Sequence, residues 1–279
     1  MGSDGDRVVL ISGASAGIGR ATADRLHDRG WTVVGASRRG TASGGGGWSP
    51  MVMDVDDDDS VRSGMEKVLA EHGRLDAVVA CAGWGLAGAA EQTPIELAKR
   101  QLETNFWGAV RVVQAALPVM RHQGGGRVVL VSSIGGIVAL PFQAFYSASK
   151  FALEGYGEAL AYEVAPFGIE VTLVEPGNVR TEFTEKRLDV VPPDPPAGEH
   201  EGEDVYADMV AKAVGLMERD EQNGVPPGDV ATVIARVLES RRPRRRVSVG
   251  KPDERVGIIA KRLLPFGVFE RAAKGSLGV

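Results

Sequence analysis

The sequence predicts an α/β protein with one doubly wound parallel sheet of about seven strands and helices on both faces. Short apolar runs recur along the chain, as they do in strands that are buried on both faces of a parallel sheet. Segments with helical periodicity lie between these runs. Because strand and helix alternate, successive strands are expected to run parallel, with a helix crossing over one face.

The predicted strands are short segments of near-continuous apolar character. RVVLIS at residues 7–12 is the first of them. The absence of polar alternation favours strands with both faces covered. The full set comprises residues 7–12, 31–37, 51–55, 75–83, 127–133, 169–177 and 245–250.

Capping signals mark the predicted helices. Residues 17–29 end before Gly30, which is placed at the C-cap. Residues 56–73 open on acidic N-capping residues and end on a glycine. In QTPIELAKRQLETN, Thr93 is the expected N-cap and Pro94 the first helical residue.

The chain is expected to form a single domain over residues 1–279. TASGGGGWSP at residues 41–50 is expected to be a flexible loop. A substrate-lid insertion is expected near residues 180–228, and its Pro- and acid-rich part, residues 188–204, is predicted to be mobile. The C-terminal extension near residues 251–279 mixes apolar and basic residues; we expect it to cover the pocket or meet a partner subunit rather than rest on a membrane.

Composition argues against several classes of function. The net charge of −5 carries no nucleic-acid signature. One cysteine and four scattered histidines offer no metal-ligand spacing, and Cys81 lies in an apolar run where a buried, inert thiol is expected. No apolar stretch reaches the length of a membrane span, and MGSDGDR lacks a signal-peptide pattern, so a cytoplasmic protein is expected.

SGASAGIG at residues 12–19 directly follows the first predicted strand and precedes a helix. Gly13, Gly17 and Gly19 let the turn tighten and let backbone N–H groups approach a pyrophosphate at the helix N-terminus. Because strand, glycine loop, helix and strand occur in this order, the segment predicts a Rossmann-like dinucleotide site.

The residues that end the second strand indicate which nicotinamide cofactor binds. An acid there binds the ribose 2′-hydroxyl of NAD, whereas an arginine accommodates the 2′-phosphate of NADP. The chain has Ser37, Arg38 and Arg39 and no acid. NADP(H) is therefore expected; NAD(H) is the alternative if the two arginines only begin an exposed loop.

YSASK at residues 146–150 places a tyrosine four residues before a lysine. On a helix the two side chains share a face. A free phenol has a pKa of about 10, and a neighbouring cation lowers it. Tyr146 and Lys150 therefore fit a tuned general acid or base, although such pairs also occur as ordinary surface residues.

These segments, with Asn105, Ser133 and PGNVRT at residues 176–181, resemble the classical short-chain dehydrogenase/reductases. The resemblance runs from residue 7 to about residue 185 and extends loosely to about residue 250. The stretch from Gly126 to Val171 is similar in particular to the 17β-hydroxysteroid and retinol dehydrogenase branch.

The resemblance implies a catalytic set. Tyr146 would be the acid/base, Lys150 would lower its pKa and hold the nicotinamide ribose, and Ser133 would bind the substrate oxygen. Asn105 would hold a water for proton relay. Ser132, the neighbouring candidate, is expected to point to the opposite face because side chains alternate along a strand.

The resemblance also implies the remaining cofactor contacts. Asp54 would contact the adenine, and Pro176, Gly177 and Thr181 would lie against the nicotinamide. The complete predicted cofactor set is Gly13, Ser15, Gly17, Ile18, Gly19, Arg38, Asp54, Val55, Ala82, Gly83, Tyr146, Lys150, Pro176, Gly177, Val179 and Thr181.

One segment departs from the family pattern. The family usually has Asn-Asn-Ala-Gly after the fourth strand, whereas this chain has Ala80, Cys81, Ala82 and Gly83. The asparagine before Ala-Gly in the family braces the central sheet. Its replacement by Cys81 affects that bracing, whereas Gly83 is retained for a close approach to the cofactor.

Together these residues predict an NADP(H)-dependent oxidoreductase that interconverts a hydrophobic ketone and a secondary alcohol. One alternative is a cofactor-sensing protein without turnover, which would have no need of Tyr146. Another is an epimerase or dehydratase relative that uses the nicotinamide transiently.

The expected substrate is bulky and hydrophobic, such as a steroid-like molecule. Apolar residues near Tyr146 and in the insertion are predicted to line its pocket, although Ile137 and Val138 fit ordinary core equally well. The apolar candidates are Ile137, Val138, Leu140, Pro141, Phe142, Phe145, Phe183 and Met209.

A homodimer or homotetramer is expected because two predicted helices, residues 99–121 and 149–165, are apolar on more than one face. One face of each helix can pack on the sheet, and the other needs a partner. The resemblance also implies that these helices pair across a two-fold axis.

Overall fold

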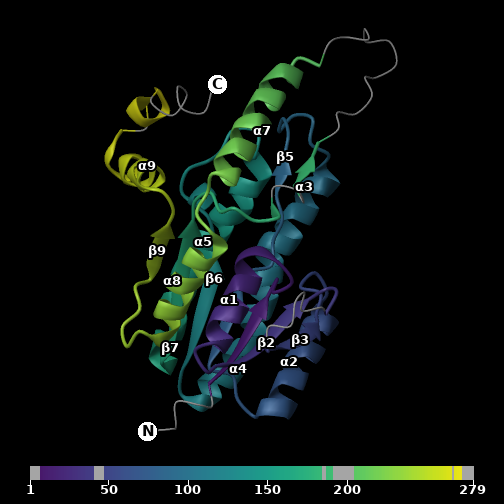
Figure 1. Cartoon of the computed structure of the whole chain (residues 1–279), viewed down its shortest axis with the longest axis vertical. Coiled ribbons are helices and arrows are strands. Elements are labelled where there is room, and N and C mark those ends of the chain that lie inside the picture. The colour runs from purple at the N-terminus through teal and green to yellow at the C-terminus, as the bar shows by residue number, and fades with distance from the viewer. Residues whose placement is uncertain (1–6, 41–46, 184–186, 191–203, 266, 272–279) are drawn as a thin grey trace.

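The computed structural model describes residues 7–40, 47–183, 187–190, 204–265 and 267–271. Seven parallel strands form its main sheet, in the order β3-β2-β1-β4-β6-β7-β9 (Figure 1). The strands are β1 (Val8–Ser12), β2 (Thr32–Ser37), β3 (Ser49–Val52), β4 (Ala77–Ala80), β6 (Gly126–Val131), β7 (Ile169–Pro176) and β9 (Arg246–Val249). The predicted doubly wound parallel sheet is confirmed.

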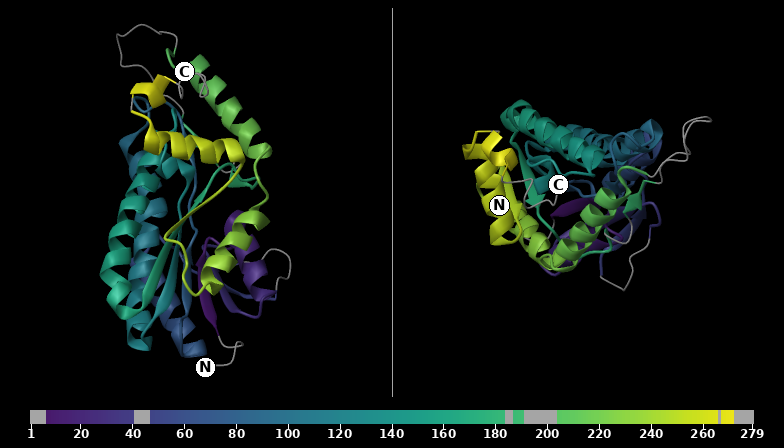
Figure 2. Two further views of the ribbon diagram at one scale, coloured as in Figure 1. Left: turned by 90° about the vertical axis from the view of Figure 1, so that its left-hand side faces the viewer. Right: turned by 90° about the horizontal axis from the view of Figure 1, so that it is seen from above.

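Helices cover both faces of this sheet (Figure 2). Residues of α2, α4 and α5 pack on one face, and residues of α1 and α8 pack on the other. The helices are α1 (Gly17–His27), α2 (Asp58–His72), α3 (Ile95–Leu102), α4 (Gly108–Gln123), α5 (Ala144–Val164), α7 (Ala207–Gln222), α8 (Pro227–Glu239) and α9 (Pro252–Leu263).

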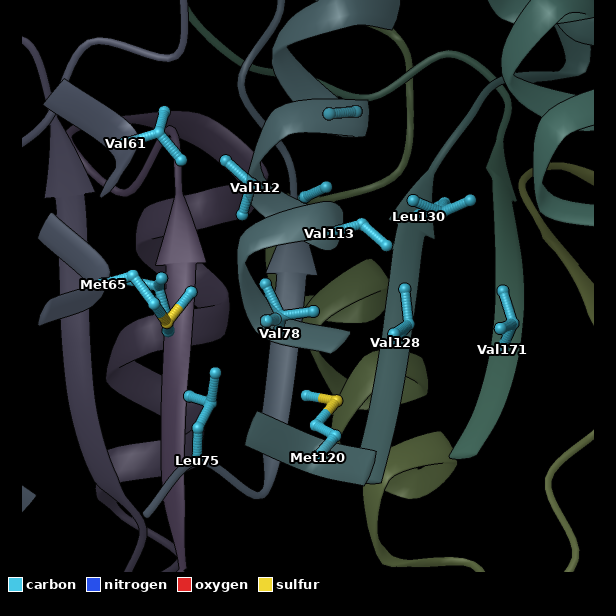
Figure 3. Packing of buried hydrophobic residues seen from close by; sticks show 14 of the residues in the cluster. Val61, Met65, Leu75, Val78, Val112, Val113, Met120, Val128, Leu130 and Val171 are labelled. Carbon is cyan, nitrogen blue, oxygen red and sulfur yellow. The ribbon is translucent and has the colours of Figure 1, made fainter. Parts of the chain in front are cut away.

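The larger core lies between the sheet and helices α2, α4 and α5 (Figure 3). Val78 of β4 and Val128 of β6 point into it, and Val113 and Met120 of α4 pack against them. All four side chains are buried. The two strand residues have no solvent-facing side because both faces of a central parallel strand are covered. This packing fixes the carboxyl ends of the central strands.

The strand order reverses direction at β1. From β1 the chain adds β2 and β3 on one side and then returns to place β4 on the other. In open α/β sheets, ligands bind outside the carboxyl ends of the strands at such a switch point. The loops after β1 and β4 are therefore the expected walls of a site.

Some predicted element ends are wrong. Thr93 does not cap α3, because its hydroxyl donates to the carbonyl of Ala89 at 2.8 Å and Pro94 occupies the N-cap position. The C-cap of α1 is Asp28. Gly30 instead turns the chain two residues later, with a φ of 79° that favours glycine.

The two predicted loops are partly ordered as strands. Residues 49–50 of the 41–50 segment belong to β3, and residues 188–189 form β8 (Leu188–Asp189). β8 pairs with β5 (Leu86–Ala87) in a separate two-stranded sheet, and so ties the insertion to the loop after β4. The mobility predicted for residues 41–46 and 191–203 lies outside the described residues.

No described residue of helix α9 lines the main pocket, and the expectation that the C-terminal extension covers the pocket or meets a partner subunit stays a prediction. The Glu254 carboxylate accepts hydrogen bonds from the backbone and side-chain nitrogens of Asn178, both at 2.8 Å. The helix therefore supports the loop after β7 from outside. Within the described ranges no helix is long and apolar enough to cross a membrane.

Two aromatic side chains remain exposed on the helices expected to meet a partner. Trp107 is 49% exposed and Phe151 is 43% exposed, whereas Val113 and Leu153 of the same helices are buried against the sheet. This distribution agrees with one face packed on the sheet and one face outward. Homo-oligomerisation stays a prediction.

Candidate active site

The glycine loop after β1 is shaped by close backbone contacts. Gly13 has a φ of 72°, and a Cβ on it would lie 2.8 Å from the backbone of Ala82. Gly17 has a φ of 53° and begins α1, whose N-cap residue Ala16 makes no side-chain capping bond. The first N–H groups of α1 therefore face the pocket without a side-chain cap, which fits a bound pyrophosphate.

The loop after β4 is braced by a residue that sequence reasoning missed. Ser12 at the end of β1 accepts hydrogen bonds through its hydroxyl from the backbone N–H groups of Cys81 (3.1 Å) and Ala82 (3.2 Å). A serine thus joins β1 to β4 where the family asparagine is missing. Its position at the end of a buried strand beside a glycine loop is the sequence signal that could have identified it.

Cys81 is partly exposed to the pocket, so the expectation that it is fully buried is wrong. Burial nevertheless raises the pKa of its thiol to about 11, while Lys150 acts to lower it. At neutral pH the side chain is therefore a thiol and a poor nucleophile, as expected from the sequence.

One end of the pocket carries arginines and acids together. Arg38 and Arg39 follow β2, and Asp54 and Asp56 follow β3. Burial raises the pKa of the Asp56 carboxyl, while the hydroxyl of Thr104 donates to it at 2.8 Å and lowers it. Arg38 is close enough to Asp56 to lower this pKa further, and its side chain is exposed while lining the pocket.

Asn105 lies in a π-helical turn, Glu103–Trp107, between α3 and α4. Its side-chain oxygen accepts from the backbone N–H of Trp84 at 3.0 Å, and its amide donates to the carbonyl of Trp84 at 3.0 Å and to Ser149 at 3.2 Å. π-Helical turns occur frequently at functional sites. This one explains why asparagine, a poor helix former, stands inside a helical stretch.

Ser133 caps a short 3-10 turn, Ile134–Gly136, that follows β6. Its hydroxyl accepts from the backbone N–H of Gly135 at 3.0 Å and donates to the carbonyl of Pro176 at 3.4 Å, and it lies close enough to Tyr146 to lower the pKa of the phenol. Ser132 instead lies against Glu154 of α5. The side chains of the two serines therefore diverge as predicted, and Ser133 is the one beside the tyrosine.

Tyr146 does not show the lowered pKa that the sequence predicted. Burial raises the pKa of its phenol to about 12, the nearby hydroxyl of Ser133 acts to lower this pKa, and the negative charge of Glu221 acts to raise it. Burial dominates because the charged phenolate loses hydration in the pocket. The Tyr146 ring lies edge-on to Phe183, with centroids 5.8 Å apart.

Lys150 lies one turn after Tyr146 on α5, with Nζ 5.9 Å from the centre of the tyrosine ring. The ammonium donates to the carbonyl of Val131 at 2.9 Å. Burial lowers the pKa of Lys150 to about 8, whereas the charges of Cys81 and Glu154 act to raise this pKa. The ammonium is thus directed toward the end of β6 rather than toward the phenol, and this explains why Lys150 does not lower the raised pKa of Tyr146.

A single cavity of about 840 Å³ joins all these groups at the carboxyl edge of the sheet. Each residue of the predicted catalytic and cofactor sets lines it. Arg38 and Asp54 follow β2 and β3 on one side of β1, whereas Ser133 follows β6 on the other side. Lining residues that sequence reasoning did not assign to the site include Met53, Asp56, Trp84, Arg100, Thr104, Gln143, Asn178, Glu182, Leu188, Ala213, Leu216, Met217, Asp220 and Glu221.

The predicted apolar substrate wall is partly right. Leu140, Pro141 and Phe183 line the cavity. Met209 does not, because it lies near the outer end of α7 and is 45% exposed. The other apolar candidates, Ile137, Val138, Phe142 and Phe145, are also absent from the lining.

Comparison with known sequences assigns the chain to a family. A family model described as short chain dehydrogenase matches residues 7–190. The chain therefore belongs to the short-chain dehydrogenase family, whose members are oxidoreductases with a nicotinamide cofactor, and the resemblance seen in the sequence is confirmed.

Particular relatives match over different lengths. The 3-ketodihydrosphingosine reductase of Bacteroides thetaiotaomicron is 38% identical over 269 residues, covering 96% of this chain and 97% of that protein. Retinol dehydrogenase 8 of Bos taurus is 37% identical over 266 residues, covering 88% of this chain and 83% of that protein. Human 17-beta-hydroxysteroid dehydrogenase type 1 is 40% identical over 196 residues, covering 65% of this chain and 59% of that protein.

A solved structure agrees with the fold over nearly the whole chain. A short-chain dehydrogenase from Streptomyces avermitilis has a TM-score of 0.81 and 32% sequence identity, and the match covers 98% of this chain and 99% of that chain.

Proposed function

We propose that this protein is an NADP(H)-dependent oxidoreductase that interconverts a hydrophobic ketone and a secondary alcohol. The observation that carries the proposal is the convergence of Asn105, Ser133, Tyr146 and Lys150 on one cavity that also contains the glycine loop. Asn105 comes from the π-helical turn, Ser133 from the end of β6, and Tyr146 and Lys150 from α5. A structural role for each would not require all of them to line one cavity with Gly13.

The residues of the cavity fit a bound nicotinamide dinucleotide. Gly13 lets the loop pack closely, because a Cβ there would lie 2.8 Å from the backbone of Ala82, and the first turn of α1 offers N–H groups to the pyrophosphate. Asp54 and Val55 would lie at the adenine, and Pro176, Val179 and Thr181 at the nicotinamide. When bound, the cofactor supplies or accepts the hydride.

The protein's own groups would then move the proton and hold the reacting oxygen. In reduction, the phenol of Tyr146 donates its proton to the substrate oxygen, and in oxidation the phenolate accepts it. The hydroxyl of Ser133, which lines the cavity with Tyr146, donates to the same oxygen and stabilises its developing charge. Lys150 supplies positive charge, and Asn105 fixes the backbone at Trp84.

The preference for NADP(H) is tested at Arg38. A 2′-phosphate carries about two negative charges, and an exposed guanidinium that lines the cavity can bind it through charge-assisted hydrogen bonds. Arg38→Asp is expected to lower the ratio of kcat/KM for NADPH over NADH by about a hundredfold or more. Initial rates with each cofactor measure the ratio.

Arg62→Asp is the control for this variant, because Arg62 is an exposed arginine on α2 that pairs with Asp59 and lies outside the cavity lining. The ratio should stay at the wild-type value. A wild-type protein that already used NADH more efficiently than NADPH would contradict the assignment.

The substrate is proposed to be a long, largely apolar ketone. Leu140, Pro141 and Phe183 form one apolar wall, and Leu216 and Met217 of α7 form another. The near full-length similarity to a 3-ketodihydrosphingosine reductase favours a long-chain ketone over a steroid, for which the matching relative covers less of the chain.

The test compares a long-chain 3-ketone with a small polar 2-keto acid under the same NADPH concentration. The long-chain ketone is expected to have the higher kcat/KM, by roughly a hundredfold, because several methylene groups leave water on binding. Higher efficiency on the small acid would refute the substrate class and leave the oxidoreductase assignment intact.

Three further expectations from the sequence stay predictions: a homodimer or homotetramer, a cytoplasmic location, and a mobile lid. The sensor alternative is disfavoured because Ser133 and Tyr146 both line the cavity that contains the glycine loop. A protein that only bound the cofactor would not need this pair.

A further inference from the structure

Helix α5 carries a buried acid one turn after Lys150. Glu154 follows Lys150 by four residues, so the two side chains lie on one face of the helix. Both residues are buried. Glu154 does not line the cavity, so the proposed reaction gives it no direct part. A buried carboxylate loses its hydration, and its charge therefore requires a partner of opposite sign.

Glu154 belongs to a cluster of charged groups between α5, β7 and β9. One of its carboxylate oxygens lies 3.1 Å from Nε of Arg246 on β9. Glu175 on β7 is 1% exposed, lies 3.7 Å from the same Nε and accepts from the hydroxyl of Ser248 at 2.5 Å. Glu158, one turn further along α5, also pairs with the guanidinium, at 2.8 Å, but is 54% exposed. Arg246 thus faces two buried carboxylates and one exposed carboxylate.

The charges of the buried groups balance only when Lys150 is included. Arg246 supplies one positive charge to the two buried carboxylates of Glu154 and Glu175, whereas water hydrates the exposed carboxylate of Glu158. A second cation is needed, because an uncompensated buried charge is strongly unfavourable. Lys150 is the cation that shares a helix face with Glu154, and the negative charge of Glu154 favours its ammonium form.

The other groups that face Lys150 are neutral. After β4, Cys81 is a thiol at neutral pH because burial raises its pKa to about 11. On α5, Tyr146 is a neutral phenol because burial raises its pKa to about 12. The π-helical turn contributes the amide of Asn105, and β6 contributes a backbone carbonyl at 2.9 Å from the ammonium. Among the described residues, Glu154 is therefore the carboxylate that acts on the charge of Lys150.

The carboxylate of Glu154 is held in place from two sides. Arg246 pairs with it from β9, and the hydroxyl of Ser132 lies against it from the end of β6. Burial raises the pKa of Glu154, whereas Ser132 and Arg246 act to lower it. A Cβ on Gly136 would lie 2.9 Å from Oγ of Ser132 and 3.1 Å from Cγ of Glu154, so the glycine leaves the two side chains room to meet. These contacts favour a charged carboxylate on the same helix face as Lys150.

We propose that Glu154 is a positioning residue of the active site, because its carboxylate is the counter-ion that holds Lys150 as an ammonium. Lys150 lines the cavity, and Glu154 acts through it without entering the cavity. The inference rests on the proposed function and adds to it the residue that fixes the charge of Lys150 at neutral pH.

The test measures the Kd of NADPH by fluorescence titration on either side of pH 8, with wild type and Glu154→Gln. Wild-type affinity is expected to fall as Lys150 loses its proton, with a midpoint near pH 8. Removing the negative charge disfavours the ammonium, so the pKa of Lys150 falls and the midpoint in Glu154→Gln is expected roughly one pH unit lower. At pH 8 the Kd of this variant should therefore be about fivefold higher than that of wild type.

Two further variants separate charge from structure. Glu158→Gln removes an exposed carboxylate that pairs with the same Arg246, and its midpoint should stay at the wild-type value. Glu154→Asp keeps the negative charge and should return the midpoint toward wild type. Damage to the fold alone would raise Kd by a similar factor at every pH and would leave the midpoint in place.

Three results would overturn the inference: no pH dependence in a wild type that binds NADPH, a wild-type midpoint in Glu154→Gln, or the same shift in Glu158→Gln. Should Glu154→Gln fail to fold, the double variant Glu154→Gln/Arg246→Gln removes both members of the ion pair, which proteins tolerate better than the loss of one. Its midpoint is also expected below wild type, by a smaller amount because a positive charge is removed as well, and an unchanged midpoint would count against the proposal. A folded wild type that did not bind NADPH would instead refute the proposed function, and this inference with it.

Discussion

Replacing Tyr146 with phenylalanine is expected to lower kcat for ketone reduction by about a hundred- to ten-thousandfold, the usual contribution of general acid–base catalysis. The substitution removes only the hydroxyl that would donate the proton and leaves the other residues of the cavity in place. The ring keeps its edge-on contact with Phe183, so the cavity should retain its shape. The rate is measured from the absorbance of the reduced cofactor, and cofactor affinity from a fluorescence titration.

Tyr156→Phe is the matched control for this prediction. Tyr156 lies on the same helix, α5, outside the cavity lining, and its hydroxyl is buried with no hydrogen-bond partner among the described residues. Removing the hydroxyl of Tyr156 should leave kcat within about twofold of wild type, because a buried hydroxyl outside the cavity has no part in proton transfer. Wild-type kcat in Tyr146→Phe would show that another group transfers the proton.

Replacing Lys150 with alanine is expected to weaken NADP(H) binding and to lower kcat by roughly a hundredfold. Lys150 is buried beside Tyr146, and its ammonium donates to the carbonyl of Val131. Its loss removes positive charge from the place where the substrate oxygen becomes negative, and leaves that carbonyl without its donor. The two effects are separated by measuring the cofactor Kd and kcat independently.

The pH dependence adds a second test of Lys150. Burial lowers its pKa to about 8, so the side chain is charged below this pH and neutral above it. Affinity for the anionic cofactor is therefore expected to fall as the pH rises through 8. Lys150→Arg keeps its charge and should lose this dependence. Unchanged Kd and kcat in Lys150→Ala would contradict the role of this residue.

The parts of the fold that follow a regular pattern could be predicted from the sequence. Buried parallel strands have near-continuous apolar runs, so their positions along the chain could be predicted. Gly13, Gly17 and Gly19 occur where a dinucleotide loop requires them. Tyr146 and Lys150 are separated by one helical turn, which a sequence shows directly. Asn105 and Ser133 could be assigned only through the family resemblance.

Features that depend on tertiary contacts could not be predicted. The bracing by Ser12 requires knowing that β1 lies next to β4. The raised pKa of Tyr146 arises from burial, which a motif does not reveal. The cavity face of α7 has the correct helical spacing in the sequence, but nothing in that spacing shows which side of the helix meets Tyr146.

The most direct test of the proposed chemistry is the stoichiometry of cofactor and product with a long-chain ketone. NADPH and the wild-type protein are mixed with limiting ketone, and the reduced cofactor is followed by absorbance while the alcohol is quantified by mass spectrometry. We expect one molecule of NADPH to be oxidised for each molecule of alcohol formed, because the hydride leaves the cofactor permanently. Conversion of substrate without net loss of NADPH would indicate an epimerase or dehydratase, and binding of NADPH without turnover would indicate a sensor; either result would contradict the assignment.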